Sequence, residues 1–142
     1  MSKMTVTLRS TVYGADGAGE TSEATYRGHY EEVGGQAQLS WQAEGRRSAL
    51  CFAPADRTRL SLRERGESEV ELRFCVGEES RTLYRVPGVG SLDMTVRTTR
   101  LENRLGAQGG TLLLAYEAEI GGAEQRLLLK ITAKTEKTDA DQ

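Results

Sequence analysis

Two alternating segments joined by a pair of glycines decide the fold: Thr111-Leu-Leu-Leu-Ala-Tyr-Glu-Ala-Glu-Ile120, then Gly121-Gly122, then Ala123-Glu-Gln-Arg-Leu-Leu-Leu-Lys-Ile-Thr-Ala-Lys134. Glycine accepts the positive φ angles that a two-residue hairpin turn needs. With the turn at this place, Tyr116 faces Leu127 on one side of the hairpin, and Glu117 faces Arg126 on the other. A slip of one residue would move every apolar side chain to the wrong face. The segment therefore predicts an antiparallel hairpin with a fixed register.

A second pair, Gly34-Gly35, predicts another hairpin of the same kind. This turn pairs positions 30 with 39, 28 with 41 and 26 with 43, so we expect the ring of Trp41 to lie over Gly28. Further along, the alternation predicts that Arg63 faces Glu71, that Phe74 faces Tyr84 and that Arg85 faces Asp93.

About ten short alternating segments follow one another with short connections, and no segment shows a sustained helical period. Sequential hairpins favour an all-β, antiparallel up-and-down barrel of about 8–10 strands, in which closure removes exposed sheet edges. We expect one domain over residues 1–134 and a polar, disordered C-terminal tail over 135–142.

Composition narrows the location and the partners. The formal charge of −2 gives no overall field that would attract nucleic acid or an acidic membrane. The N-terminal residues show no apolar signal region, and no stretch is long and apolar enough to cross a membrane. We therefore expect a cytoplasmic protein in which Cys51 and Cys75 stay reduced.

Several hydroxyl-bearing residues share the inward parity of their strands, and one arginine continues that line. They could form a lumen that anchors the carboxylate of a small amphipathic or acidic ligand, or they could simply fill the barrel. These candidate ligand-binding residues are Tyr26, Tyr30, Tyr84, Thr98, Arg100 and Tyr116, with Arg100 and Tyr84 as the polar anchors.

Two outward sets give alternatives. Arginines on consecutive strands could form a wall that binds RNA or anions. However, residues 57–104 hold ten basic and eight acidic residues, and no outward aromatic side chain offers a stacking surface. Nucleic acid is therefore the less favoured partner. The second set forms an apolar patch on the last hairpin and predicts a homodimer or another protein interface. The wall comprises Arg63, Arg73, Arg81 and Arg97, and the patch comprises Leu113, Ala115 and Leu128.

Catalytic motifs are missing from the sequence. The single histidine, His29, shares its face with charged residues and should point to solvent. There is no nucleophile elbow, metal-ligand cluster or phosphate-binding loop. We expect no enzymatic activity, no metal and no cofactor.

Several stretches resemble the YwiB-like family of small bacterial proteins: Phe74-Cys-Val-Gly77, Tyr84-Arg-Val-Pro-Gly-Val-Gly90, Thr98 and Gly109-Gly-Thr-Leu-Leu-Leu-Ala-Tyr116. The resemblance spans roughly residues 4–134. It implies a calycin-like (lipocalin-related) β-barrel without an established activity. Where the family tends to show Thr-Pro-Tyr-Gly after the aromatic strand, this chain has Val86-Pro-Gly-Val-Gly90, so no functional residue is carried over.

Overall fold

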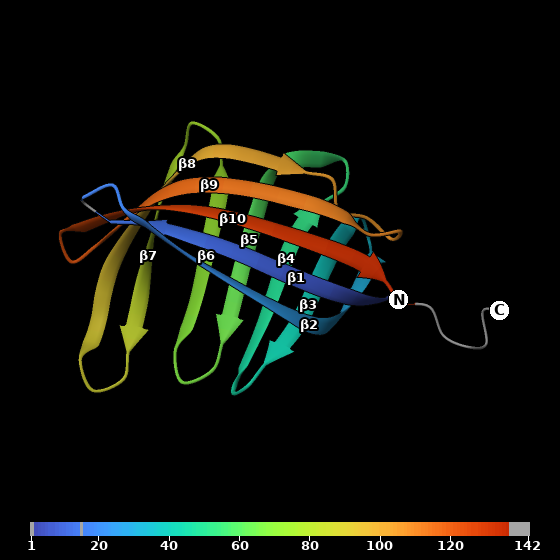
Figure 1. The fold of residues 1–142 in the computed structure, drawn as a ribbon, viewed down its shortest axis with the longest axis horizontal. Coiled ribbons are helices and arrows are strands. Elements are labelled where there is room, and N and C mark those ends of the chain that lie inside the picture. Colours follow the sequence, from blue (N-terminus) through green and yellow to red (C-terminus); the bar gives the residue numbers. More distant parts are fainter. Residues whose placement is uncertain (1, 15, 137–142) are drawn as a thin grey trace.

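The computed structural model describes residues 2–14 and 16–136, with the side chains of Tyr84 and Val86 left out of the description. Over these ranges the chain forms ten antiparallel strands and no helix (Figure 1). The strands are β1 (Ser2–Tyr13), β2 (Gly19–Val33), β3 (Gln36–Ala43), β4 (Arg46–Ala53), β5 (Asp56–Arg65), β6 (Glu69–Cys75), β7 (Glu79–Val86), β8 (Gly90–Asn103), β9 (Gly110–Ile120) and β10 (Ala123–Thr135).

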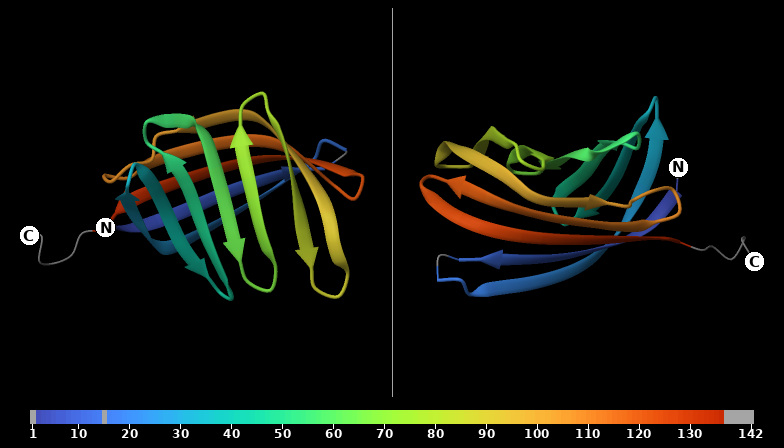
Figure 2. Two further views of the ribbon diagram at one scale, coloured as in Figure 1. Left: turned by 180° about the vertical axis from the view of Figure 1, so that it is seen from behind. Right: turned by 90° about the horizontal axis from the view of Figure 1, so that it is seen from above.

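The strands follow one another around a nearly closed up-and-down barrel. Their order in the sheet is β6-β5-β4-β3-β2-β1-β10-β9-β8-β7, so the first strand pairs with the last. Seen from behind, β3 to β7 form the wall that crosses in front of β1, β9 and β10 (Figure 2). The predicted all-β meander barrel is confirmed. Within the described ranges, no helix has the length and apolar character needed to cross a membrane.

The barrel closes at one point between β6 and β8. Val76 forms a parallel bridge with Thr98. The backbone N–H of Cys75 donates to Thr98 Oγ1 at 3.2 Å, and the N–H of Gly77 donates to the Thr98 carbonyl at 3.3 Å. Thr98 is only 2% exposed. It therefore holds the β6–β7 turn against the wall of the barrel.

Both Gly-Gly registers are confirmed. In the last hairpin Tyr116 pairs with Leu127, and Gly121 and Gly122 have φ angles of 57° and 86°. In the earlier hairpin Gly28 pairs with Trp41. The atoms nearest to a Cβ at Gly28 are the Ser40 carbonyl oxygen and Val6 Cγ2, rather than the ring of Trp41. The β2–β3 ladder has its last pair at Gly28, so the expected pairing of positions 26 and 43 is not formed.

Alternation places one apolar set inside the barrel. The most deeply buried of these side chains come from β1, β3, β4, β6, β8, β9 and β10 and from the β8–β9 loop: Met4, Val6, Leu39, Leu50, Phe74, Val96, Leu105, Leu112, Leu114 and Ile131. Because each strand contributes every second residue, the barrel interior is a single core.

Two predicted strand pairs are wrong. Phe74 pairs with Leu60, and β6 shares no ladder with β7, because the chain turns at Val76 to meet β8 instead. Asp93 pairs with Leu83, since the β7–β8 connection shifts the register by two residues from the expected one. The predicted pair of Arg63 and Glu71 is confirmed.

The C-terminal strand runs slightly further than expected. Thr135 pairs with Met4, and the N–H of Glu136 donates to the Lys3 carbonyl at 3.0 Å. The first two residues of the expected tail therefore continue the contact between β10 and β1. Residues 137–142, the rest of that tail, lie outside the described part of the chain.

Candidate functional site at the open mouth of the barrel

A pocket of about 170 Å³ lies at one end of the barrel, between strands from both walls. The residues that line it occupy inward positions of β1 to β5, β9 and β10: Leu8, Ser10, Tyr26, Trp41, Arg46, Ser48, Leu62, Glu64, Tyr116, Leu127 and Leu129. The deeper positions of the same strands are closed by the apolar core. The pocket therefore has an apolar floor and a polar rim.

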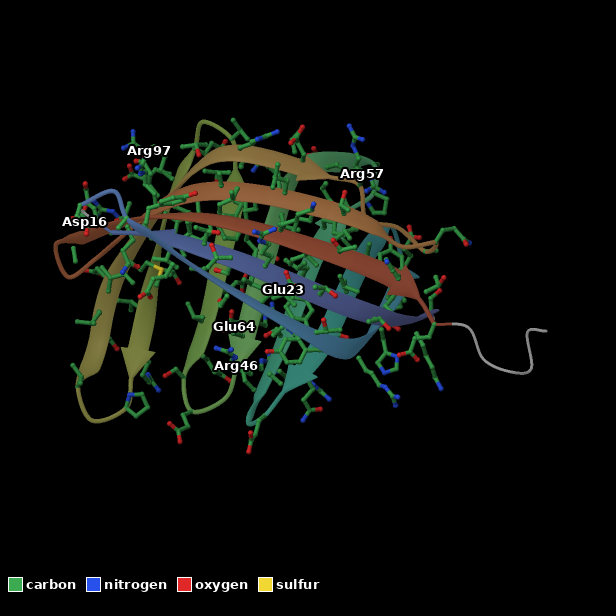
Figure 3. All side chains as sticks on the ribbon, viewed as in Figure 1. Asp16, Glu23, Arg46, Arg57, Glu64 and Arg97 are labelled. Atoms are coloured by element: carbon green, nitrogen blue, oxygen red, sulfur yellow. The ribbon has the colours of Figure 1, made fainter. Side chains whose placement is uncertain are left out.

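An ion pair marks the rim. Arg46 Nη1 lies 3.2 Å from Glu64 Oε2, with the arginine side chain 56% exposed and the glutamate 29% exposed. Figure 3 shows these two side chains together in the lower middle of the view. A pair that is this open to water is held weakly, because solvent screens the attraction. Arg46 can therefore exchange Glu64 for another anion.

A neutral phenol lies deeper in the pocket. Burial, and then the nearby Glu64 carboxylate, raises the pKa of Tyr116 to about 12. Tyr116 therefore keeps its proton at neutral pH. Its ring stacks at a tilt on Phe74, with 4.9 Å between the centroids, which fixes the orientation of the phenol.

The opposite end of the barrel is sealed. Arg57 Nη1 donates to the Leu105 carbonyl at 2.7 Å and to the Asn103 carbonyl at 3.3 Å, and its guanidinium carbon lies 5.3 Å from the centroid of the Phe52 ring. Figure 3 shows Arg57 at the upper right of the view and Arg46 at the lower middle. Leu105 is itself only 1% exposed, so this arginine holds a buried segment of the chain in place.

The structure separates the predicted ligand-binding residues. Tyr26 and Tyr116 line the pocket at the mouth. Tyr30 lies at the sealed end, only 2% exposed, with its ring centroid 6.5 Å from that of Phe52. Burial raises the pKa of Tyr30, and the Glu32 carboxylate adds to the rise. The Thr98 hydroxyl accepts the hydrogen bond from Cys75 that helps to close the barrel.

The two predicted polar anchors have different outcomes. The placement of Arg100 in the lumen is wrong, because the register of β8 shifts between Thr98 and Arg100 and turns the side chain outward. It lies on the outer surface, where Nη2 is 2.8 Å from Glu102 Oε2. Tyr84 pairs through its backbone with Leu92, and its side chain is among those left undescribed.

Sequence reasoning missed three rim residues although their parity pointed to them. Glu64 shares the inward parity of Leu60 and Leu62 on β5. Arg46 and Ser48 precede the buried Leu50 at the same spacing on β4, and Ser48 is itself buried. Extending each alternating run to its polar end would have identified all three.

The arginine wall is largely neutralised. Arg63 and Arg73 each lie 3.4 Å from Glu71, and Arg97 lies 3.1 Å from Glu117. Arg81 is exposed and makes no ion pair with the residues described here. Three of the four arginines thus have acidic partners, and this argues against a phosphate-binding surface.

The apolar patch on the outer face has the expected register. Leu128 pairs with Ala115, and Leu113 pairs with Lys130. All three patch residues are half-buried by their neighbours in the sheet. Self-association through this patch stays a prediction. Elsewhere, Cys51 and Cys75 are free thiols, and within the described ranges no three His, Cys, Asp or Glu side chains are grouped to hold a metal ion.

The fold and the pocket define a small β-barrel protein that is sealed at one end and open at the other. The chain belongs to the family described as domain of unknown function DUF1934, whose model matches residues 6–129. It is similar to the crystal structure of the YwiB protein from Bacillus subtilis, with a TM-score of 0.82 and 18% identity over 96% of this chain and 93% of that one. The expected YwiB-like family is thereby confirmed. Comparison with curated proteins gave no match.

Proposed function

We propose that this protein is a cytosolic binding barrel for a small amphipathic carboxylic acid held at the open mouth. The observation that carries the proposal is the pocket, in which apolar side chains form the floor and Arg46 stands at the rim. A few convergent polar groups over an apolar lining are typical of small-molecule sites.

The size of the pocket limits the ligand. A volume of about 170 Å³ is close to the roughly 150 Å³ of an apolar cavity that accepts benzene. The apolar part of the ligand should therefore be a single ring or a short branched chain. A long fatty acyl chain would not fit.

The polar groups set the orientation of the ligand. The carboxylate would bind the exposed Arg46, displacing Glu64, while the apolar end would lie between Leu62 and Leu127. The neutral phenol of Tyr116 offers a further hydrogen-bond donor below the rim. Hydrogen bonds to a charged group contribute about 1.5–3 kcal/mol, so the arginine should account for a large share of the affinity.

The single tryptophan of the chain, Trp41, lines this pocket, so its fluorescence reports on the site directly. We would titrate the protein with phenylacetate, isovalerate and, as a cationic control, phenylethylamine. The acids should shift the emission, and Arg46→Gln should weaken them about tenfold, as expected from the loss of about 1.4 kcal/mol.

Arg47→Gln is the matched control, since Arg47 neighbours Arg46 but is exposed on the opposite parity of β4. This variant should bind the acids as the wild type does. If none of the acids shifts the emission at millimolar concentration, and native mass spectrometry of the gently purified protein gives only the apo mass, the proposal is wrong.

A further inference from the structure

A seam runs down the barrel between β6 and β7. The two strands are neighbours in the chain and run side by side from their turn (Figures 1 and 2). Near the turn, the N–H of Glu78 donates to the Cys75 carbonyl, and Ser80 Oγ donates to the Arg73 carbonyl, both at 3.0 Å. Beyond these contacts no ladder joins the strands, which stand at the two ends of the sheet order.

Each strand therefore has one free edge. β6 pairs only with β5, and β7 only with β8, among the residues that the structure describes. The backbone N–H and C=O groups that face the seam have no ladder partner there. Such an edge is a template for a further strand, because an incoming chain can satisfy these groups with regular hydrogen bonds.

Two hollows lie beside the seam on its β6 side. One, about 490 Å³, is lined mostly by residues of β4, β5 and β6 and reaches Ser80 of β7. The other, about 290 Å³, lies over β5 and β6 and reaches Leu83 of β7. Both include Glu71, so the outer surface is hollowed along β6 next to the seam.

The chemistry of the β7 edge selects the occupant. Its outward residues include Arg81, Leu83 and Arg85, spaced two apart on one face. Both arginines are exposed and make no ion pair within the described ranges, and Leu83 is 63% exposed. An added strand places its side chains directly opposite these positions, where opposite charges and apolar pairs are favourable.

We propose that the seam between β6 and β7 binds an extended segment of a partner protein as an added strand along β7, with the outward pattern acidic–apolar–acidic. The two acidic residues pair with Arg81 and Arg85, and the apolar residue covers Leu83. Small β-forming residues occupy the alternate positions of the added strand. These positions face the barrel interior, as the positions of Ser80 and Thr82 on β7 do. This surface is separate from the mouth of the barrel, so the inference does not depend on the proposed ligand.

The test uses a designed peptide with a fluorophore at its N-terminus, fluorescein-Thr-Glu-Thr-Val-Thr-Glu-Thr-amide, in an anisotropy titration with the full chain. Two control peptides separate the contributions. One carries lysine in place of both glutamates, and the other carries N-methyl groups on alternate amides, which removes backbone donors but keeps the charge. We expect binding of the glutamate peptide and at least tenfold weaker binding of both controls.

Variants locate the site. The double variant Arg81→Glu/Arg85→Glu should no longer bind the glutamate peptide and should bind the lysine peptide instead. A misfolded protein would not show this reversal of preference. Arg9→Glu, an exposed charge change on the outer face of β1, should leave the binding unchanged. Equal binding of all three peptides, no charge swap in the double variant, or no binding at millimolar protein would each overturn the inference.

Discussion

The two ends of the barrel each carry an arginine, and the difference between them shows how one residue type serves two purposes. Arg57 donates to the backbone carbonyls of Asn103, at the end of β8, and of Leu105, in the β8–β9 loop, and it covers the Phe52 ring. Arg46 faces a carboxylate in a pair that is half open to water. Backbone carbonyls cannot move away, whereas a flexible glutamate can. Arg57 therefore stabilises the sealed end of the barrel, whereas Arg46 can change its partner.

The interior follows the same division. At the sealed end the inward positions are large and apolar or aromatic, as at Phe52 and Leu105. Toward the mouth they become polar, as at Ser10, Ser48 and Glu64. A barrel of this size has room for either a complete core or a pocket at a given level. This chain has the core at one end and the pocket at the other.

The largest expected effect comes from glycines at the two ends. Gly110 at the sealed end has a φ of 136°, and a Cβ there would overlap the Arg104 carbonyl oxygen. Gly122 in the β9–β10 turn has a φ of 86° and open space around it. Gly110→Ala should lower the free energy of unfolding by about 4 kcal/mol, from backbone strain and overpacking together. Gly122→Ala should cost about 1 kcal/mol. Urea unfolding measures both, and equal costs would contradict the contrast between the ends.

The next effect concerns the outer patch beside the mouth. If Leu128 packs against a second copy, that copy covers the wall formed by β1, β10 and β9. The mouth is then less accessible in the dimer than in a single chain. Leu128→Asp should then weaken the dimer by about 3 kcal/mol, since each copy loses at least about 1.5 kcal/mol of apolar burial. Sedimentation velocity checks this result, with Thr132→Asp on the same outer face as the control. A wild-type monomer at high micromolar concentration would show that the patch is not an interface.

Exchanging the two arginines for methionine tests the contrast directly. Arg57→Met leaves the Leu105 and Asn103 carbonyls without their charged donor, and the free energy of unfolding should fall by about 2 kcal/mol. Arg46→Met removes an exposed ion pair and should cost less than about 1 kcal/mol. Thermal and urea unfolding of the two variants give the comparison. A larger cost for Arg46→Met would reverse the roles assigned to them.

The smallest effect appears at alkaline pH. The pKa of Tyr116 is about 12 in the folded protein, against about 10 for an unfolded tyrosine. The unfolded state therefore loses its proton first, so stability is complete below pH 10 and declines as the pH rises through 12. The loss should reach about 1.4 kcal/mol at pH 11.

Tyr116→Phe should remove most of this alkaline decline in urea unfolding. Tyr30 at the sealed end also has a raised pKa. Its deprotonation at alkaline pH therefore lowers the free energy of unfolding as well. If Tyr116→Phe left the decline unchanged and Tyr30→Phe removed it, the responsible phenol would be at the sealed end instead.

Local patterns of the sequence predicted the hairpins well, because each Gly-Gly turn sets a register that the alternation of the flanking strands can verify. Parity also predicted that Tyr26 and Tyr116 point inward. It failed at Arg100, where one extra residue in β8 reverses the face without any change in residue type. It failed again at Phe74, because contact between β6 and β8 depends on how distant segments meet. Non-local register of this kind cannot be derived from a single alternating run.

The pairing of the first strand with the last has a consequence for how the chain folds. Leu8 lies opposite Ile131, so the ladder that joins the two ends of the meander links residues from opposite ends of the sequence. On a ribosome, β1 to β9 would emerge with the facing edges of β1 and β9 unpaired, because β10 pairs with both of them, and the two parts of the sheet could join only after β10 has emerged. Distant pairings are slow to form, and unpaired edges aggregate in the meantime. Folding should therefore be limited by this last ladder, and a chaperone would act on the open sheet that precedes it.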